Sequence, residues 1–318
     1  MNWNFLYSFI IERVAFSNEQ FSANYKHDLN ESFKHLRSGS SYYLKFGDMK
    51  RLGKKKNERS ARKPKPTAPK VPAATPAEVE GMRLNKYVAH CGICSRRQAA
   101  DYIKAGLVAV NGNVRMEPGY QVEKGDKITY KGEVIRPEEH LVYILMNKPK
   151  GVITTLKDDR GRKTVMDLLQ GKVKERIFPV GRLDRDTSGL LVFTNDGDLA
   201  KKMTHPSHKM KKFYQVTLDK PVIKADLEKI RTGLELEDGP ALVDGVDYVR
   251  DQGKEVVGIE LHIGRNRIVR RIFEHLGYEV KRLDRQYIGG LTKKDLPRGF
   301  WRHLTEQEVI MLKHFTGK

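Results

Sequence analysis

The sequence predicts an α+β protein in which a mixed, mostly antiparallel β-sheet carries short flanking helices, with a smaller α/β module preceding it. Two observations support this fold class. Short apolar runs recur between glycine-rich or charged turns, and several of them alternate in polarity as half-buried strands do. The helical patterns between these runs are only a few turns long. A chain of 318 residues is also long enough for about two domains plus extensions.

The composition indicates a polyanionic partner. Lys and Arg total 60 against 40 Asp and Glu, which gives a net charge of +20. Nucleic acid and an anionic membrane surface are the two candidates for such a chain. No apolar run approaches the roughly 20 residues of a spanning helix, and neither a basic amphipathic helix nor a lipid anchor is evident, so nucleic acid is favoured over a membrane. The presence of only two cysteines fits a reducing cytoplasm.

Residues 1–81 are expected to be disordered. The apolar start of residues 1–48 lacks the positive region of a secretory signal. The composition changes abruptly at Met49, and we hypothesise that Met49 is the biological start; a native protein whose intact mass retained Met1 would refute this. Residues 50–81 are rich in Lys and Arg and then in Pro and Ala, so they cannot bury enough apolar area to fold. This linker would either attract RNA in a salt-sensitive way or only aid solubility.

Residues 82–140 are expected to form a small α/β module. Leu84 and Tyr87 have helical spacing, and Ser95 suits the N-cap of a second helix over residues 96–104. Two short strand patterns follow, the first with an Asn-Gly turn. The helices carry cations that could reach phosphates together, and these candidate RNA-binding residues are Arg83, Lys86, Arg96, Arg97 and Lys104. The alternative is that they only form a solvated face.

The C-x-x-C pair of this module requires a separate interpretation. Cys91 and Cys94 have no further cysteines to complete a four-ligand zinc site, and no thioredoxin-like strand and helix surround them. We interpret both as small packing residues in a helix–turn–helix, and we predict no metal site.

The segment 179–198 carries the densest polar motif of the chain. Apolar runs on both sides predict two buried strands, and the loop between them is bounded by Gly181 and Gly189. The loop places Asp184 close to Asp186 and among arginines. Rigid strands often hold catalytic loops, although composition alone favours a solvated, self-paired charged turn. Asp-x-Asp pairs could bind Mg²⁺, but aspartates in turns also cap backbone amides, so no magnesium site is predicted.

Further elements are predicted in residues 141–318. Tyr214 lies in an alternating strand, and Arg265, Arg267, Arg270 and Arg271 crowd the start of a helix. Like charges so close are unfavourable unless anions are nearby. The expected strands are residues 141–146, 211–218 and 256–263, and the expected helices are residues 164–169, 198–203 and 268–277.

Several strings resemble known families. Gly181-Arg-Leu-Asp-Arg-Asp-Thr-Ser-Gly-Leu-Leu resembles the catalytic motif of pseudouridine synthases of the RsuA/RluB type. The strings Lys148-Pro-Lys-Gly-Val, Lys212-Phe-Tyr-Gln-Val and Lys281-Arg-Leu-Asp-Arg resemble further motifs of that family. Gly264 to Arg271 is similar to its motif Gly-Arg-x-x-Gln-Val-Arg-Arg, except that Ile268 replaces the glutamine. The module is similar to the S4 RNA-binding domain through Arg83-Leu-Asn-Lys-Tyr, Ser95-Arg-Arg-Gln-Ala and Gly106-Leu-Val-Ala-Val-Asn-Gly.

This resemblance implies three parts: an extension and basic linker over residues 1–81, an S4-like RNA-binding domain over residues 82–140, and a synthase domain with the pseudouridine synthase fold over residues 141–318. It implies isomerisation of uridine to pseudouridine in RNA, a reaction that needs no cofactor because the formula is unchanged. The implied site residues are Asp184 as the catalytic carboxylate, Arg182 in the gap left by the flipped uridine, Tyr214 against the target base, and Arg270 as the partner that keeps Asp184 ionised.

The role of Asp184 remains open, because attack on C1′, attack on C6 and proton removal all use a carboxylate. We expect a cytoplasmic monomer that acts on ribosomal RNA or a pre-ribosomal particle, with large-subunit (23S) rRNA preferred to small-subunit (16S) rRNA. The alternatives are a non-catalytic ribosome-assembly factor and a metal-dependent RNA hydrolase.

Overall fold

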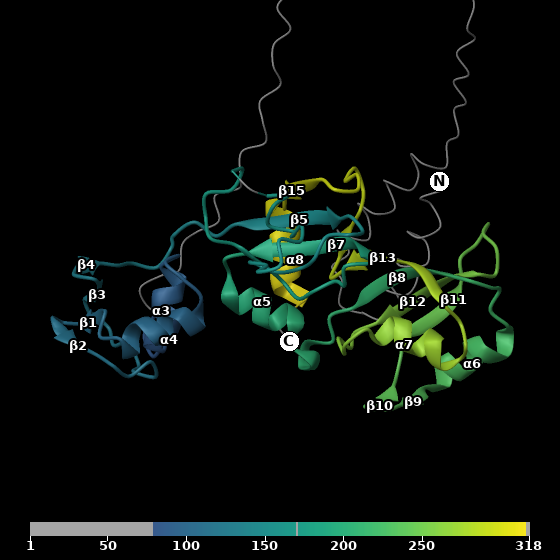
Figure 1. Cartoon of the computed structure of the whole chain (residues 1–318), viewed down its shortest axis with the longest axis horizontal. Coiled ribbons are helices and arrows are strands. Elements are labelled where there is room, and N and C mark those ends of the chain that lie inside the picture. Colours follow the sequence, from purple (N-terminus) through teal and green to yellow (C-terminus); the bar gives the residue numbers. More distant parts are fainter. Residues whose placement is uncertain (1–78, 170, 316–318) are drawn as a thin grey trace, which may run out of the picture. The chain divides into compact units, whose positions relative to one another are not determined.

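The computed structural model describes residues 79–169 and 171–315 (Figure 1). The predicted disordered extension therefore lies outside the described residues except for positions 79–81, and so does the proposed start at Met49. Within the described part of the chain, no helix is both long and apolar enough to cross a membrane.

The module of residues 82–140 has its own small sheet and hydrophobic core. Ser95 caps the second helix as predicted, because its hydroxyl accepts a 3.2 Å hydrogen bond from the Gln98 amide. Asn111 and Gly112 both have positive φ and form the predicted turn. The elements are α3 (Leu84–His90), α4 (Arg96–Lys104), β1 (Val108–Val110), β2 (Asn113–Val114), β3 (Ile128–Tyr130) and β4 (Glu133–Val134), with the antiparallel strand order β2-β1-β3-β4.

Both cysteines of the module are free thiols. Cys94 is buried in the hydrophobic core, and Cys91 packs at its margin. Burial raises the pKa of the Cys91 thiol to about 12, so it is neither a reactive nor a metal-ready thiolate at neutral pH. The interpretation of these cysteines as packing residues is therefore confirmed.

Residues 141–315 are built around one nine-stranded sheet. Its main path runs β11-β12-β8-β13-β7-β5-β15, with β14 on β13 and β6 on β7. All pairs are antiparallel except β13 with β7, which are parallel. The strands are β5 (Tyr143–Lys148), β6 (Phe178–Pro179), β7 (Thr187–Thr194), β8 (Lys212–Leu218), β11 (Gly245–Tyr248), β12 (Val256–Leu261), β13 (Val280–Ile288), β14 (Leu291–Thr292) and β15 (Trp301–His303).

Helices cover both faces of this sheet, because alternate residues of the central strands are apolar on each side. Ile144 and Leu191 belong to one core with the helices α6 and α7, whereas Leu145 and Leu190 belong to a second core with α5 and α8. In a separate hairpin of β9 (Leu234–Leu236) and β10 (Gly239–Ala241), β9 contacts α7. The helices are α5 (Gly197–Thr204), α6 (Lys224–Thr232), α7 (Ile268–His275) and α8 (Glu306–Phe315), with a 3₁₀ turn η2 (Pro206–His208). The predicted α+β fold class is confirmed.

Two local predictions are wrong. The helix expected at residues 164–169 is absent, because Thr164 forms a β-bridge with Ile153 and the residues after it form turns. The Leu169 amide donates at 3.0 Å to the Met166 carbonyl three residues back, whereas an α-helix bonds four residues back. Gly189 lies inside β7 and not at the end of the loop. A Cβ atom at Gly189 would lie 2.3 Å from the backbone oxygen of Arg285 on the neighbouring parallel strand, so a glycine is required for this close approach.

Candidate active site

A fully buried lysine contacts the backbone of the loop between β6 and β7. Lys148, at the end of β5, donates to the carbonyl oxygens of Thr187 at 2.7 Å, Asp184 at 3.0 Å and Pro149 at 3.1 Å. Burial lowers the pKa of Lys148 to about 8, whereas the carboxylates of Asp186 and Asp184 act in the opposite direction. The sequence indicated only a strand and turn here, so the role of this lysine as a brace for the loop was missed.

Two further contacts fix the backbone on either side of Asp184. The Thr154 hydroxyl donates to the Leu183 carbonyl at 2.8 Å, and the Gly151 amide donates to the Arg185 carbonyl at 2.7 Å. The backbone of the loop is therefore held at several points, whereas the side chain of Asp184 remains 36% exposed. A rigid loop with an accessible carboxylate suits a catalytic group.

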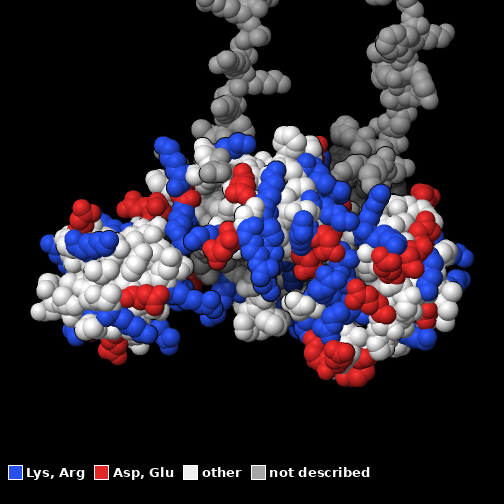
Figure 2. All heavy atoms as spheres, in the orientation of Figure 1, with Lys and Arg blue, Asp and Glu red and all other residues white. Residues whose placement is uncertain are grey.

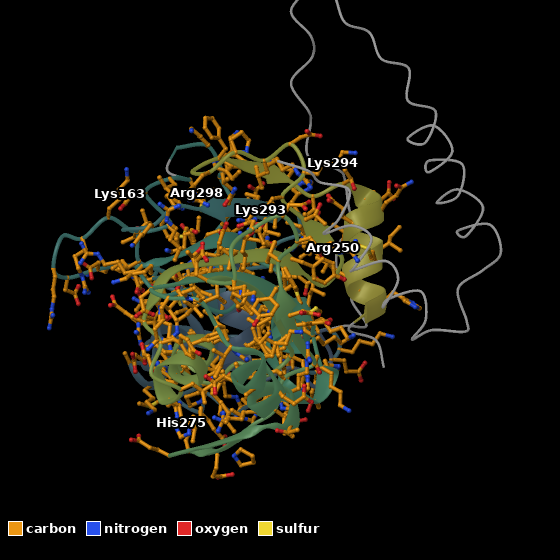
Figure 3. The ribbon with its side chains drawn as sticks, turned by 90° about the vertical axis from the view of Figure 1, so that its right-hand side faces the viewer. Lys163, Arg250, His275, Lys293, Lys294 and Arg298 are labelled. Carbon is orange, nitrogen blue, oxygen red and sulfur yellow. The ribbon has the colours of Figure 1, made fainter. Side chains whose placement is uncertain are left out.

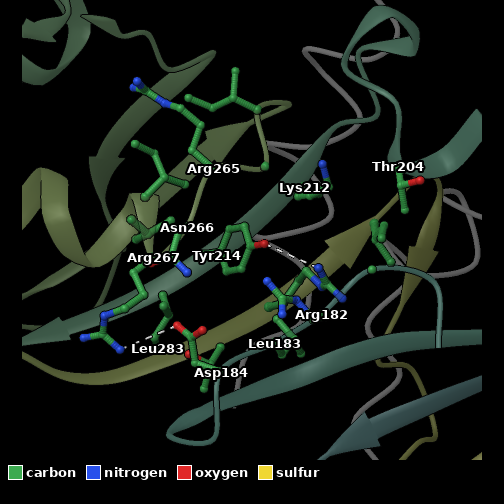
Figure 4. Close-up of a pocket in the computed structure, with 18 of the residues that line it drawn as sticks. Arg182, Leu183, Asp184, Thr204, Lys212, Tyr214, Arg265, Asn266, Arg267 and Leu283 are labelled. Carbon is green, nitrogen blue, oxygen red and sulfur yellow. Dashed lines mark hydrogen bonds and ion pairs between the residues drawn. The ribbon is translucent and has the colours of Figure 1, made fainter. Parts of the chain in front are cut away.

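Asp184 lies in the wall of a cavity of about 300 Å³ (Figure 4). This volume is at the lower end of small-molecule sites and is enough for a single nucleobase. The walls come from the loop, β8, β13 and the segment that precedes α7, and the charged and aromatic lining residues are Arg182, Asp184, Lys212, Tyr214, Arg265, Arg267 and Arg285.

The arginine that faces Asp184 is Arg267 and not Arg270. Arg267 Nη1 lies 3.8 Å from Asp184 Oδ2 (Figure 4), and it is also 3.9 Å from Asp186 Oδ1. Arg270 Nη2 instead pairs with Asp186 Oδ2 at 2.8 Å, and its Nη1 donates to the Val280 carbonyl at 3.0 Å. Arg270 lies on the buried face of α7, whereas Arg267 is the N-cap residue at the cavity, which explains why the expected Arg270–Asp184 pair is absent.

Two of the arginines crowded at the start of α7 pair with an aspartate of the same chain. Arg265 Nη1 lies 3.0 Å from Asp238 Oδ1 in the turn between β9 and β10, and Arg271 Nη1 donates to Asp238 Oδ2 at 2.9 Å. Arg271, and then Arg265, lower the pKa of the Asp238 carboxyl. Ile268, which replaces the family's glutamine, is buried in the core beside these arginines.

Tyr214 is buried on β8 and is held by an arginine that the sequence reasoning missed. Arg285 Nη1 donates to the Tyr214 hydroxyl at 3.4 Å, and Arg285 Nε donates to the Leu190 carbonyl at 2.7 Å. Only 3% of Arg285 is exposed. Arg182 differs from it, because Arg182 is exposed at the rim of the cavity.

The aspartate of the motif that begins at Lys281 lies in a separate cluster. Asp284 pairs with Lys293 at 2.5 Å and with Arg298 at 3.1 Å, and it accepts a 2.9 Å hydrogen bond from the Ser188 hydroxyl. The labelled Lys293 and Arg298 lie near each other in Figure 3. These contacts join β13 to β7 beside the loop of Asp184, so we interpret this aspartate as structural.

The five candidate RNA-binding cations of the module do not behave alike. Lys86 Nζ pairs with the Asp198 carboxylate at 2.8 Å and is only partly exposed. The exposed members are Arg83, Arg96, Arg97 and Lys104. Figure 2 also shows Lys and Arg gathered over the middle of the face that it draws. The structure therefore leaves four of the five predicted residues available to an anionic partner.

A braced carboxylate, a buried tyrosine and several cations around one cavity define a site for a flat ligand that carries negative charge. Comparisons with known proteins specify the class. The family model for RNA pseudouridylate synthase matches residues 142–275, and the S4 domain model matches residues 82–128. The chain belongs to the RNA pseudouridylate synthase family.

Three relatives illustrate this membership. The chain is 42% identical over 234 residues to the ribosomal large subunit pseudouridine synthase B of Bacillus subtilis, covering 73% of this chain and 95% of that one. It is 40% identical over 233 residues to the dual-specificity RNA pseudouridine synthase RluF of Escherichia coli, covering 73% and 78%. A crystal structure of a pseudouridylate synthase superposes with a TM-score of 0.53 at 29% identity, covering 72% of this chain and 99% of that one. The family resemblance inferred from the motifs is confirmed.

Proposed function

We propose that this protein isomerises specific uridines to pseudouridine in ribosomal RNA, with the large-subunit rRNA as the preferred target. The observation that carries the proposal is the braced loop that presents Asp184 to a base-sized cavity beside Tyr214. The large-subunit choice is supported by the name of the Bacillus subtilis relative, which the chain matches over 95% of that protein's length.

The reaction breaks the C1′–N1 bond of uridine, turns the base and joins C1′ to C5. Asp184 acts on the sugar or the base as nucleophile or proton acceptor, and the Arg267 guanidinium lies 3.8 Å from its carboxylate. The target uridine must leave the helix stack, which costs a few kcal/mol. Tyr214 offers a face on which the base can stack, a contact that contributes about 1–3 kcal/mol in other proteins. Arg182 fills the gap that the extruded base leaves.

The S4 domain binds the surrounding RNA through its exposed cations Arg83, Arg96, Arg97 and Lys104. Lys86 contributes less, because Asp198 already neutralises it. We further propose that the protein is a cytoplasmic monomer and that it acts on rRNA or on a partly assembled ribosomal particle. The isomerisation requires no oxidant, reductant or added group.

Mapping of pseudouridine tests the proposal. Unmodified 23S and 16S rRNA would be incubated with the protein, labelled with carbodiimide and read by primer extension. We expect a new stop in 23S rRNA with wild-type protein and with Asp247→Asn, an exposed carboxylate on β11, and none with Asp184→Asn. A stop only in 16S rRNA would overturn the choice of subunit. Tight binding without a stop in either free rRNA or ribosomal particles would favour an assembly factor.

A further inference from the structure

Lys212 is a cation in the cavity wall that the proposed mechanism does not yet use. It begins β8, two residues before Tyr214, so the two side chains lie on the same face of the strand (Figure 4). The strand is central in the sheet, with Lys212 opposite Leu261 on one side and Ile288 on the other. The positions of Lys212 and Tyr214 are therefore fixed relative to each other at a separation of roughly 7 Å along the strand.

The ammonium group of Lys212 has unused donor capacity. Its Nζ donates to the His262 carbonyl at 3.0 Å, and it forms no other hydrogen bond and no ion pair with the described residues. An ammonium has three donors, so two remain for a ligand. The nearby acid Asp244 is engaged elsewhere, because its oxygens lie 2.8 and 2.9 Å from His262 Nδ1.

The environment of Lys212 disfavours its positive charge. Burial, and then the Arg285 guanidinium, lower its pKa to about 8, whereas Asp244 acts in the opposite direction. A half-buried cation without a paired anion loses part of its hydration, and this cost is offset if the substrate supplies the negative charge. The charged or titratable groups that face this part of the cavity from other elements are Arg182, Asp184, Asp244, His262, Arg265, Arg267 and Arg285.

We propose that the Lys212 ammonium is a catalytic donor to a carbonyl oxygen of the target uracil, where it stabilises the negative charge that the base acquires during the isomerisation. This inference rests on the proposed function. When the C1′–N1 bond breaks, its electron pair stays on N1 and is delocalised onto O2 and O4. The C5 atom then bonds to C1′, the proton on C5 is lost, and N1 takes up a proton. If a nucleophile adds to C6 first, the charge again develops on O4.

A base that lies on the Tyr214 ring has an edge within reach of Lys212, because the two side chains share one face of β8. A fixed cationic donor at a carbonyl oxygen stabilises the transition state more than the neutral substrate. Lys212→Met should therefore lower the single-turnover rate by about 10²–10³-fold, as removal of an oxyanion donor does elsewhere. Its affinity for rRNA should stay within about threefold of wild type.

The matched control is Lys211→Met. Lys211 is the neighbouring residue, but it points to the other face and pairs with Glu260 at 3.3 Å, so its loss should leave the rate unchanged. Lys212→Arg keeps a cation and should restore part of the lost rate. The wild-type rate should fall as the pH rises through about 8, where Lys212 loses its proton, and Lys212→Arg should lose the part of this decline that Lys212 causes, even where deprotonation of Lys148 leaves a remainder.

Each outcome decides a separate point. An unaltered rate for Lys212→Met overturns the inference. A loss of affinity with an unchanged rate indicates a phosphate contact and also overturns it. If Lys212→Met does not fold, the pH profile of Lys212→Arg decides instead, and an alkaline decline identical to that of wild type refutes the inference. If the wild-type protein forms no pseudouridine in any rRNA or ribosomal particle, the proposed function itself is refuted.

Discussion

Gly189→Ala should destabilise the sheet at the point where its two parallel strands meet. The new Cβ atom would lie 2.3 Å from the Arg285 oxygen, 2.4 Å from its nitrogen and 2.8 Å from its Cα, and none of these backbone atoms can rotate away. The φ of +117° also disfavours any side chain. Backbone strain of about 1–3 kcal/mol and overpacking of about 1–3 kcal/mol together give an expected loss of about 2–6 kcal/mol in the free energy of unfolding.

Urea unfolding followed by circular dichroism measures this loss. Gly264→Ala is the stability control, because a Cβ at Gly264 meets no atom within 4 Å and its φ is not in the left-handed region. Activity should fall together with stability, since Arg285 also holds Tyr214. If Gly189→Ala were within about 0.5 kcal/mol of the Gly264→Ala variant, the argument that close strand approach requires this glycine would be refuted.

Three further predictions concern the brace, the stacking residue and the S4 domain. In the wild-type protein the free energy of unfolding should rise between pH 8 and 10.5, because in that window the unfolded lysine binds a proton that the buried Lys148, with its pKa of about 8, has lost. Lys148→Met should abolish this rise, and urea titrations of both proteins at several pH values measure it. Tyr214→Leu should lower the single-turnover rate by about 10–100-fold, because the base loses its stacking partner, whereas Tyr214→Phe keeps the ring and should retain most of the wild-type rate. Equal losses of rate in the two variants, measured by quenched flow, would contradict stacking. The double variant Arg96→Gln, Arg97→Gln should reduce the slope of log affinity against log salt by about 2. Lys86→Gln should change the slope less than loss of either arginine, because Asp198 already pairs with Lys86; an equal change would contradict this.

The alternation of apolar residues was enough to predict most strands and the α+β class. Local chemistry was enough for the Ser95 cap and the Asn111-Gly112 turn, because both depend on neighbours in the sequence. The helix expected at residues 164–169 is absent because Thr164 is bridged to Ile153, a contact outside the segment that its own apolar spacing does not reveal.

The candidate site was predictable only where a motif placed a residue in the loop. Asp184 and Tyr214 line the same cavity, as the resemblance implied. The pairing of the arginines could not be derived, because it depends on how α7 is rotated and on the position of Asp238 in a hairpin. Lys148 and Arg285 were missed because a buried cation looks like any surface cation in a sequence, and only the folded chain brings carbonyl oxygens to it.

The parallel pairing of β7 and β13 has a consequence for synthesis of the protein. Ser188 and Asp284 are hydrogen-bonded across 96 positions of chain, so the loop of Asp184 meets its opposite wall only after β13 has been made. Such long-range pairing is slow, because the entropy of closing a large loop is lost before any contact compensates it. A nascent chain on the ribosome can fold its S4 domain early, but it acquires a complete cavity only after β13 has been made. Binding of RNA and competence to modify it therefore arise at different times during the life of each molecule.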